Sequence, residues 1–180
     1  MPDVIAYRKI CKLNALFDSE GQPVNPQTSE PYECYFRARI NRHFPEQAAD
    51  LENRAVYSYA EEKSFWACGY HRYGAWREQL AKLAGYAAAP YEEIEGVPSS
   101  TIMSHQVGAF AVAAGPFHEL LCFTDCDGVI GTRVAAKLAG DFADWDARIK
   151  VAADAGFYEN YTKLRQCFEM AADSGAVSIQ

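Results

Sequence analysis

The sequence predicts an α+β fold in which a mostly antiparallel sheet is covered by about three helices. Two observations support this class. Strand-like segments crowd the first 70 residues or so, and the two clearest helical patterns come after residue 131. No repeat, low-complexity tract or glycine- and serine-rich linker divides the 180 residues, so we expect a single domain spanning residues 1–180.

The first strands are predicted from alternation of apolar and polar residues. Residues 4–17 alternate in part, and residues 18–33 hold three prolines and Gly21, which indicates a loop or hairpin tip. Residues 34–44 read as a second strand that could pair with the first. Residues 55–60 and 64–68 are expected to form a hairpin across the charged turn Glu61-Glu62-Lys63.

The later elements are read mainly from helical spacing. A loop at 69–74 precedes a helix at 75–84 that ends at Gly85. Residues 102–115 fit either a strand or a short helix, and residues 117–123 are predicted as the central strand. Helices are expected at 132–150, with Thr132 as N-cap, and at 157–173, before an edge strand at 177–179.

Charge and hydropathy exclude several classes of function. A formal charge of −7 argues against non-specific binding to nucleic acid or to anionic membranes, because both require a basic surface. No apolar stretch approaches the ~20 residues that cross a bilayer, and the N-terminus lacks the layout of a signal peptide. A cytoplasmic protein is therefore expected, with its six scattered cysteines mostly buried as free thiols.

Two aspartates one residue apart, Asp125 and Asp127, form the first candidate site. They follow the predicted central strand and precede a glycine turn, so they could activate water or hold Mg²⁺ as catalytic residues. The alternative is that they satisfy backbone N–H groups near a helix start. The segment resembles the first motif of haloacid-dehalogenase-type phosphatases. Only about 50 residues follow it, too few for that family's remaining motifs, so membership is not predicted.

The second candidate site is the glycine-bounded loop 69–74 with the start of the next helix. Backbone N–H groups at a helix N-terminus can bind an anion, arginine can clamp a carboxylate or phosphate, and aromatic faces can stack on a ring. The ordinary alternative is solvated arginines and tyrosines that cap the core. The candidate ligand-binding residues are Tyr70, His71, Arg72, Tyr73, Trp76 and Arg77.

A third candidate is His118-Glu119, followed by Cys122 and Cys126. Strand alternation would place His118 and Cys122 on one face, and both His118 and Glu119 are predicted to contact the ligand. Zinc binding is not expected, because structural zinc sites use more closely spaced pairs. A Cys–His nucleophilic pair, with Cys126 beside His71 or His118, is a further alternative.

Residues 65–179 also resemble a family of uncharacterised bacterial and phage proteins. The resemblance rests on Asp125-Cys126-Asp127-Gly128, Ile130-Gly131, Lys137-Leu138-Ala139, Asp141-Phe142 and an Ala-x-x-Gly-Ala-Val ending at Val177. This chain departs from the family's signature at Thr124 and Asp127 and in the 68–74 loop. The resemblance brings no function, but it implies that the segments 70–77 and 125–131 form one unit.

Together these features predict a soluble protein that binds a small polar or anionic ligand where loop 69–74 meets the turn 125–131. If it is an enzyme, it would be a hydrolase, with Mg²⁺ as an optional cofactor and Arg72 or Arg77 neutralising developing charge. The rival hypothesis is a protein-binding accessory factor, such as an inhibitor or immunity-type protein, that presents an acidic, tyrosine-rich surface to a basic partner. The sequence does not predict an oligomeric state.

Overall fold

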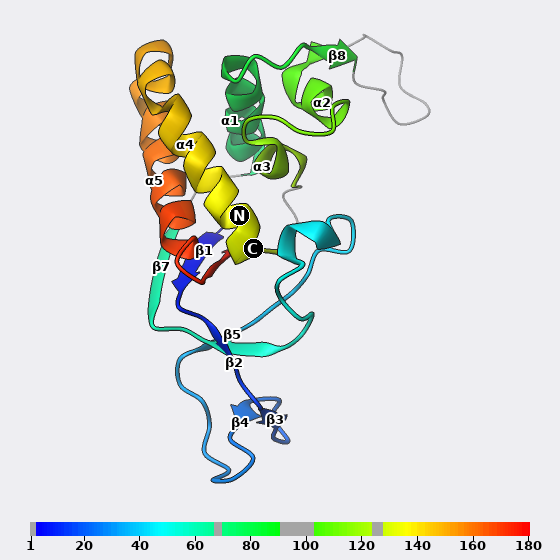
Figure 1. The fold of residues 1–180 in the computed structure, drawn as a ribbon, viewed down its shortest axis with the longest axis vertical. Helices are drawn as coiled ribbons and strands as arrows, with labels where there is room; N and C mark the ends of the chain where they lie inside the picture. Colours follow the sequence, from blue (N-terminus) through cyan, green and yellow to red (C-terminus); the bar gives the residue numbers. More distant parts are fainter. Residues whose placement is uncertain (1–2, 67–69, 91–102, 124–127) are drawn as a thin grey trace.

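The computed structural model describes residues 3–66, 70–90, 103–123 and 128–180, and Figure 1 shows its elements. The fold is α+β, as predicted. The elements in chain order are β1 (Asp3–Arg8), β2 (Cys11–Lys12), β3 (Leu16–Phe17), β4 (Pro23–Val24), β5 (Tyr35–Arg37), the 3₁₀ helix η1 (Pro45–Ala48), β6 (Val56–Ser58), β7 (Glu61–Trp66), α1 (Tyr70–Leu83), β8 (Ala89–Pro90), β9 (Met103–Ser104), α2 (His105–Phe110), α3 (His118–Cys122), β10 (Gly128–Ile130), α4 (Thr132–Ala152), α5 (Ala155–Ala171) and β11 (Ala176–Ile179).

The main sheet has the strand order β10-β11-β1-β7, and all its pairings are antiparallel. Strand β1 pairs with β11, with Val4 opposite Ile179 and Tyr7 opposite Ala176, so residues near the two ends of the chain lie side by side. The prediction that residues 177–179 form an edge strand is wrong. β11 lies between β10 and β1, and all four of its residues are buried, with Val177 and Ile179 in the large core and Ala176 in the cluster on the other face.

Alternation along β1 gives the main sheet two different faces. Val4 and Ala6 belong to the large core beneath the helices, whereas Tyr7 belongs to a second cluster on the opposite face. In that second cluster the ring of Tyr7 stacks on Phe36 at 4.2 Å between centroids, and Phe36 packs on Tyr57. The three-stranded sheet β2-β6-β5 supplies both partners, so helices cover one face of the main sheet and a small sheet covers part of the other.

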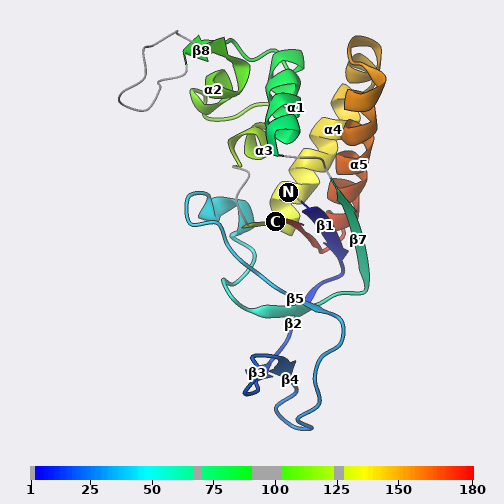
Figure 2. The same cartoon turned by 180° about the vertical axis from the view of Figure 1, so that it is seen from behind.

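Helices α4 and α5 confirm the two clearest helical predictions, and they lie side by side in Figures 1 and 2. The apolar positions expected from the spacing are buried in α4, including Val134, Leu138, Phe142 and Ile149. The predicted N-cap is wrong by one residue. Gly131 is the N-cap, and the hydroxyl of Thr132 instead donates to the carbonyl of Gly175 at 2.6 Å.

Strand pairing in the first half of the chain differs from the prediction. The expected strand 34–44 shrinks to β5, which pairs with β6 and not with β1. The expected hairpin of 55–60 with 64–68 is also wrong, because the charged residues Glu61 to Lys63 belong to β7 and pair with β1. β7 is the outer strand of the main sheet next to β1, so the charged residues lie on an edge strand and not in a turn.

The predicted loop 69–74 is largely helical, since α1 begins at Tyr70. The buried residues of α1 fall at helical spacing: Tyr73, Trp76, Arg77, Leu80 and Ala81. Gly74 misled the prediction, because a glycine inside a helix is tolerated when burial on the other positions compensates. Gly85 ends the helix with a positive φ of 86°, as expected for a residue just beyond a helix C-terminus.

The predicted central strand at 117–123 is also wrong, because His118–Cys122 is the short helix α3. Phe117, Leu120 and Leu121 are fully buried, which is helical spacing, and a short apolar run does not distinguish a buried helix from a strand. The open choice at 102–115 resolves into the two-residue strand β9 and the helix α2. Within the described residues the fold therefore has five α-helices where about three were expected. In this part of the chain, none of the helices combines the length and apolarity needed to cross a bilayer.

Candidate functional site

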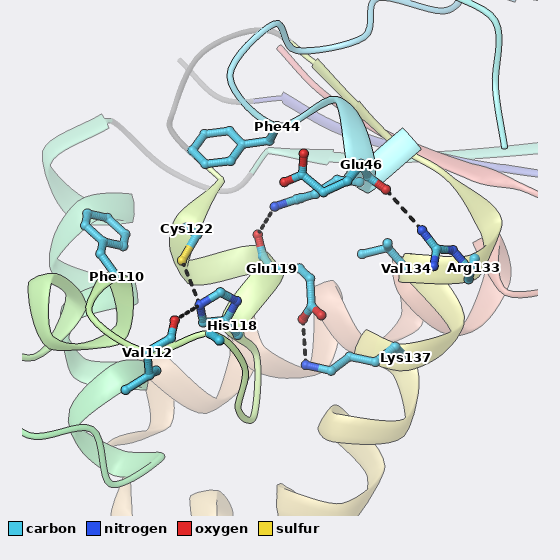
Figure 3. Close-up of a pocket in the computed structure, with 12 residues that line it drawn as sticks. Phe44, Glu46, Phe110, Val112, His118, Glu119, Cys122, Arg133, Val134 and Lys137 are labelled. Carbon is cyan, nitrogen blue, oxygen red and sulfur yellow. Dashed lines mark hydrogen bonds and ion pairs between the residues drawn. The ribbon is translucent and has the colours of Figure 1, made fainter. Parts of the chain in front are cut away.

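A pocket of about 890 Å³ lies between helix α3, the N-terminal half of α4, η1 and the segment around the end of α2 (Figure 3). Small-molecule sites usually occupy ~300–1,000 Å³, so the volume suits an organic ligand. Apolar and polar groups share the wall. The lining residues are Phe44, Glu46, Gln47, Phe110, Val112, Ala113, His118, Glu119, Cys122, Arg133, Val134 and Lys137.

Helix α3 faces the pocket with its polar side. Leu120 and Leu121 point into the core, which leaves His118, Glu119 and Cys122 on the pocket side. The prediction that His118 and Cys122 share a face is confirmed, since Cys122 Sγ lies 3.4 Å from His118 Nε2. A spacing of four residues gives that result in a helix as well as in a strand.

The tautomer of His118 follows from its partner. Nε2 lies 2.9 Å from the carbonyl oxygen of Val112, which can only accept a hydrogen bond. Nε2 therefore carries the proton, and in the neutral ring Nδ1 is an acceptor. Among the described residues Nδ1 has no hydrogen-bond partner, and Figure 3 shows this second nitrogen on the side of the ring away from Val112 and Cys122.

Cys122 is not an activated nucleophile. Burial, together with the nearby negative charge of Glu119, raises the pKa of the Cys122 thiol to about 11. The imidazole nitrogen beside it, Nε2 of His118, already carries a proton and cannot take another from the thiol. A nucleophilic cysteine needs a depressed pKa or a free base beside it, and Cys122 has neither.

Lys137, on helix α4, binds the segment before α3 and the side chain of Glu119 to that helix. Its Nζ donates to the carbonyl of Gly115 at 2.7 Å and forms ion pairs with Glu119 at 2.5 Å and Asp141 at 2.8 Å. An ammonium group has three donors, so all of them are used, and two carboxylates offset its charge. Lys137 therefore fixes the wall and has no donor left for a ligand.

Arg133 is the other cationic group of the wall with a permanent charge. Its side chain donates to the backbone carbonyl of Glu46 at 3.3 Å, and among the described residues it has no ion-pair partner. Its guanidinium group has five N–H donors, so most of them are open to a ligand. Figure 3 shows Arg133 on one side of the pocket and Phe110 on the other.

Gln47 anchors η1 to both neighbouring elements. Its side-chain Nε2 donates to the carbonyl of Glu119 at 3.0 Å, and its backbone carbonyl accepts from the N–H of Gly131 at 2.8 Å. The residue is 3% exposed. These bonds hold η1, and with it Phe44 and Glu46, against α3 and the start of α4.

Helix α2 is held in place by the carboxylate of Glu78 on α1. That carboxylate accepts from Ser104 Oγ at 2.6 Å and from the backbone N–H groups of His105 at 2.8 Å and Gln106 at 3.0 Å. Burial alone would raise the pKa of Glu78, but these three bonds outweigh it and lower the pKa. Because α2 carries Phe110, Glu78 positions this part of the pocket wall by holding the start of α2, without lining the pocket itself.

The residues of the predicted 69–77 site lie elsewhere. Tyr73, Trp76 and Arg77 are buried in α1 and do not line the pocket. Trp76 Nε1 donates to the carbonyl of Phe157 at 3.2 Å, and the guanidinium of Arg77 packs over the ring of Tyr73 and donates to the carbonyl of Phe123. Arg72 is exposed. The side chains of Tyr70 and His71 lie outside the described residues.

Asp125 and Asp127 also lie outside the described residues, as does Cys126. The guanidinium of Arg77 donates to the carbonyl of Phe123, which ties α1 to the residue that follows α3. The expectation that 70–77 and 125–131 form one unit stays a prediction. Within the described residues no group of three or more His, Cys, Asp or Glu side chains is arranged to hold a metal ion. Of the described cysteines, Cys122 and Cys167 are buried as expected, whereas Cys11 and Cys34 are exposed.

The sequence therefore identified His118 and Glu119 but missed the rest of the pocket. Gln47 comes from the 3₁₀ helix η1 and Phe44 from the residue before it, and Phe110 and Val112 come from a segment whose structure was left open. Lys137 and Arg133 lie on the polar face of a correctly predicted helix. One signal was present, since Lys137 and Asp141 are spaced as an i,i+4 ion pair, but such pairs are common on solvated helices.

Comparison with known proteins gives no further assignment. No protein-family model matches the chain, and no curated protein and no solved structure is detectably similar to it.

Proposed function

We propose that this protein binds a small organic anion with an apolar body in the pocket between α3, α4 and η1. The observation that carries the proposal is a cavity of about 890 Å³ in which apolar side chains line one part and a cation without an ion-pair partner, among the described residues, lines another. Binding sites for small molecules have this combination of an apolar wall and a few placed polar groups.

The ligand's anionic group pairs with Arg133. The other lysine or arginine of the described wall, Lys137, is already neutralised by Glu119 and Asp141. A guanidinium group recognises carboxylates and sulfonates through parallel N–H bonds. The apolar body of the ligand covers Phe110 and Val112, which are 50% and 44% exposed although they line the cavity.

The proposal concerns binding without covalent catalysis at Cys122, because that thiol is protonated at neutral pH and lacks a base. Hydrolysis by Asp125 or Asp127, with or without Mg²⁺, stays a separate hypothesis. It concerns residues outside the described part of the chain, and the proposed pocket does not depend on it.

The rival hypothesis of a protein-binding accessory factor required an exposed surface rich in tyrosine. None of the nine tyrosines whose side chains are described is exposed. They are Tyr7, Tyr32, Tyr35, Tyr57, Tyr59, Tyr73, Tyr86, Tyr158 and Tyr161. Four of them, Tyr7, Tyr57, Tyr73 and Tyr161, are buried and the other five are partly buried, which favours ligand binding over partner binding as the proposal.

The test uses 4-methylphenylacetate, a small aromatic carboxylate, in ligand-observed NMR titrations of the full chain. We expect saturable binding to the wild type and a loss of at least about fivefold in Ala113→Trp, which fills the cavity from an exposed position of its wall. Ala111→Trp is the matched control, since Ala111 is exposed nearby and is not part of the described lining. Arg133→Gln should weaken binding about fivefold. No saturable binding to the wild type, or equal binding by Ala113→Trp, would contradict the proposal.

A further inference from the structure

The pocket holds a hydrogen-bond acceptor at a defined place next to its apolar wall. His118 is half-buried, and its Nε2 is tied to the carbonyl of Val112 at 2.9 Å. This hydrogen bond fixes the tautomer of the neutral ring and holds its orientation, so in the neutral ring Nδ1 presents a lone pair. No described residue donates to Nδ1.

Two aromatic rings flank the same part of the cavity. Phe44 comes from the segment before η1 and packs its ring 6.1 Å from that of Phe123, which holds it in place. Phe110 ends α2 and is half exposed. In Figure 3 Phe110 lies at the left, Phe44 at the upper centre and His118 at the lower centre, with Arg133 at the right. Phenylalanine faces and edges bind flat rings well, and they offer a polar group no partner.

From these observations we infer that His118 determines specificity, and that the ligand is an aromatic acid whose ring carries a hydrogen-bond donor such as a phenol-type hydroxyl or a ring N–H. The ring packs against Phe44 and Phe110, its donor binds Nδ1 of His118, and its anionic group reaches Arg133. The inference rests on the proposed function and names the ligand class for the same pocket.

A pair of probes that differ in one group tests this directly. 4-Hydroxyphenylacetate and 4-methylphenylacetate have nearly the same size and the same charge, but only the first has a ring donor. We expect the wild type to prefer the hydroxyl compound about tenfold, which corresponds to a hydrogen bond of about 1.4 kcal/mol. 4-Methoxyphenylacetate, which has an ether oxygen attached to its ring but no hydrogen-bond donor, should bind no better than the methyl compound.

Two substitutions test the acceptor at Nδ1 of His118 separately from the hydrogen bond between Nε2 and the carbonyl of Val112. His118→Gln places an amide N–H near the position of Nε2, so it keeps a donor for the carbonyl of Val112 but lacks the acceptor at Nδ1. In His118→Gln the affinities for the hydroxyl and methyl compounds should become about equal. His118→Asn keeps an amide near Nδ1 and should retain part of the preference. Circular dichroism confirms that each variant is folded.

The outcomes distinguish the two proposals. If all three compounds bind the wild type equally, the assignment of His118 as the specificity determinant is overturned, and the proposed function stands. The same holds if His118→Gln keeps the full preference. If none of the compounds binds the wild type, the proposed function fails and this inference fails with it. The comparison on the wild type decides these points even if both variants fail to fold.

Discussion

Helices α4 and α5 and the α2–α3 segment lie on either side of the pocket and are held in place by different forces. The α4–α5 pair is fixed by apolar packing, with aromatic rings in contact across the two helices, such as Phe142 with Tyr161 at 4.7 Å between centroids. Short helices α2 and α3 bury apolar residues as well, such as Leu120 and Leu121, and polar contacts from Glu78, Lys137 and Asp141 hold the segment in addition. The first region provides a rigid support. The second provides six of the twelve residues that line the pocket, including His118 and Phe110, as binding segments on a stable scaffold often do.

The largest effect is expected from breaking the packed region. Phe142 is fully buried and contacts Phe117, Tyr161 and Phe168. Phe142→Ala should lower the free energy of unfolding by about 3–5 kcal/mol, since it removes a ring from a close-packed core. Urea denaturation followed by circular dichroism measures the change. Val151→Ala, at an exposed position of the same helix, should change stability by less than about 0.5 kcal/mol.

Removing the contact that Lys137 makes between α4 and the α3 segment should lower the stability by a smaller amount. Lys137→Met removes the donor to Gly115 and leaves Glu119 and Asp141 facing each other without a cation. We expect the free energy of unfolding, measured by urea denaturation, to fall by about 1–2 kcal/mol. Relative to the wild type, amide hydrogen exchange should accelerate more in α3 than in α5. Lys163→Met, which breaks an exposed ion pair within α5, is the control. Equal exchange in α3 for both variants would argue against Lys137 as the tether.

Glu78 should make the stability of the protein depend on pH, because its carboxylate holds helix α2 in place. Its folded-state pKa lies below its usual value, so its contribution is fully present above the unfolded-state pKa of about 4.3 and is lost as the pH falls through the lower folded-state pKa. Glu78→Gln should therefore cost about 1–2 kcal/mol at pH 7, and the difference from the wild type should shrink as the pH is lowered below about 4. A difference that stayed constant from pH 7 to pH 2.5 would contradict this assignment. Asp144→Asn, at an exposed site, should show no such trend.

The smallest effect concerns chemical reactivity and not stability. Because burial and Glu119 raise the pKa of Cys122 to about 11, alkylation by iodoacetamide at pH 7 should be slower at Cys122 than at the exposed Cys11 and Cys34. Peptide mass spectrometry after timed labelling compares the three sites in one sample. Faster labelling of Cys122 would mean that the thiol is activated, and the view of this pocket as a binding site without a nucleophile would have to change.

The same contrast explains which features could be predicted from the sequence. Helices α4 and α5 were predicted because their buried residues recur at helical spacing, and this spacing is what packing requires. Helix α3 was mistaken for a strand, because the short apolar run at 120–123 fits both structures. The start of α1 was mistaken for a loop, because Gly74 outweighed the helical spacing of Tyr73, Trp76 and Leu80.

The pocket was predicted only in part for a related reason. His118 and Glu119 were selected for their chemistry, and the structure places both on its wall. Gln47, Phe110 and Arg133 come from three other segments, and nothing local to each segment indicates the contact between them. The sites proposed at Asp125 and Asp127, and at the side chains of Tyr70 and His71, stay predictions.

The most direct measurement is a map of backbone amide shifts in ¹H–¹⁵N correlation spectra as 4-hydroxyphenylacetate is added to the full chain. The account predicts that the shifts concentrate in residues 44–47, 110–113, 118–122 and 133–137, which surround the pocket. Shifts confined to the β3–β4 hairpin or to α5, or no saturable shifts at millimolar probe, would contradict it.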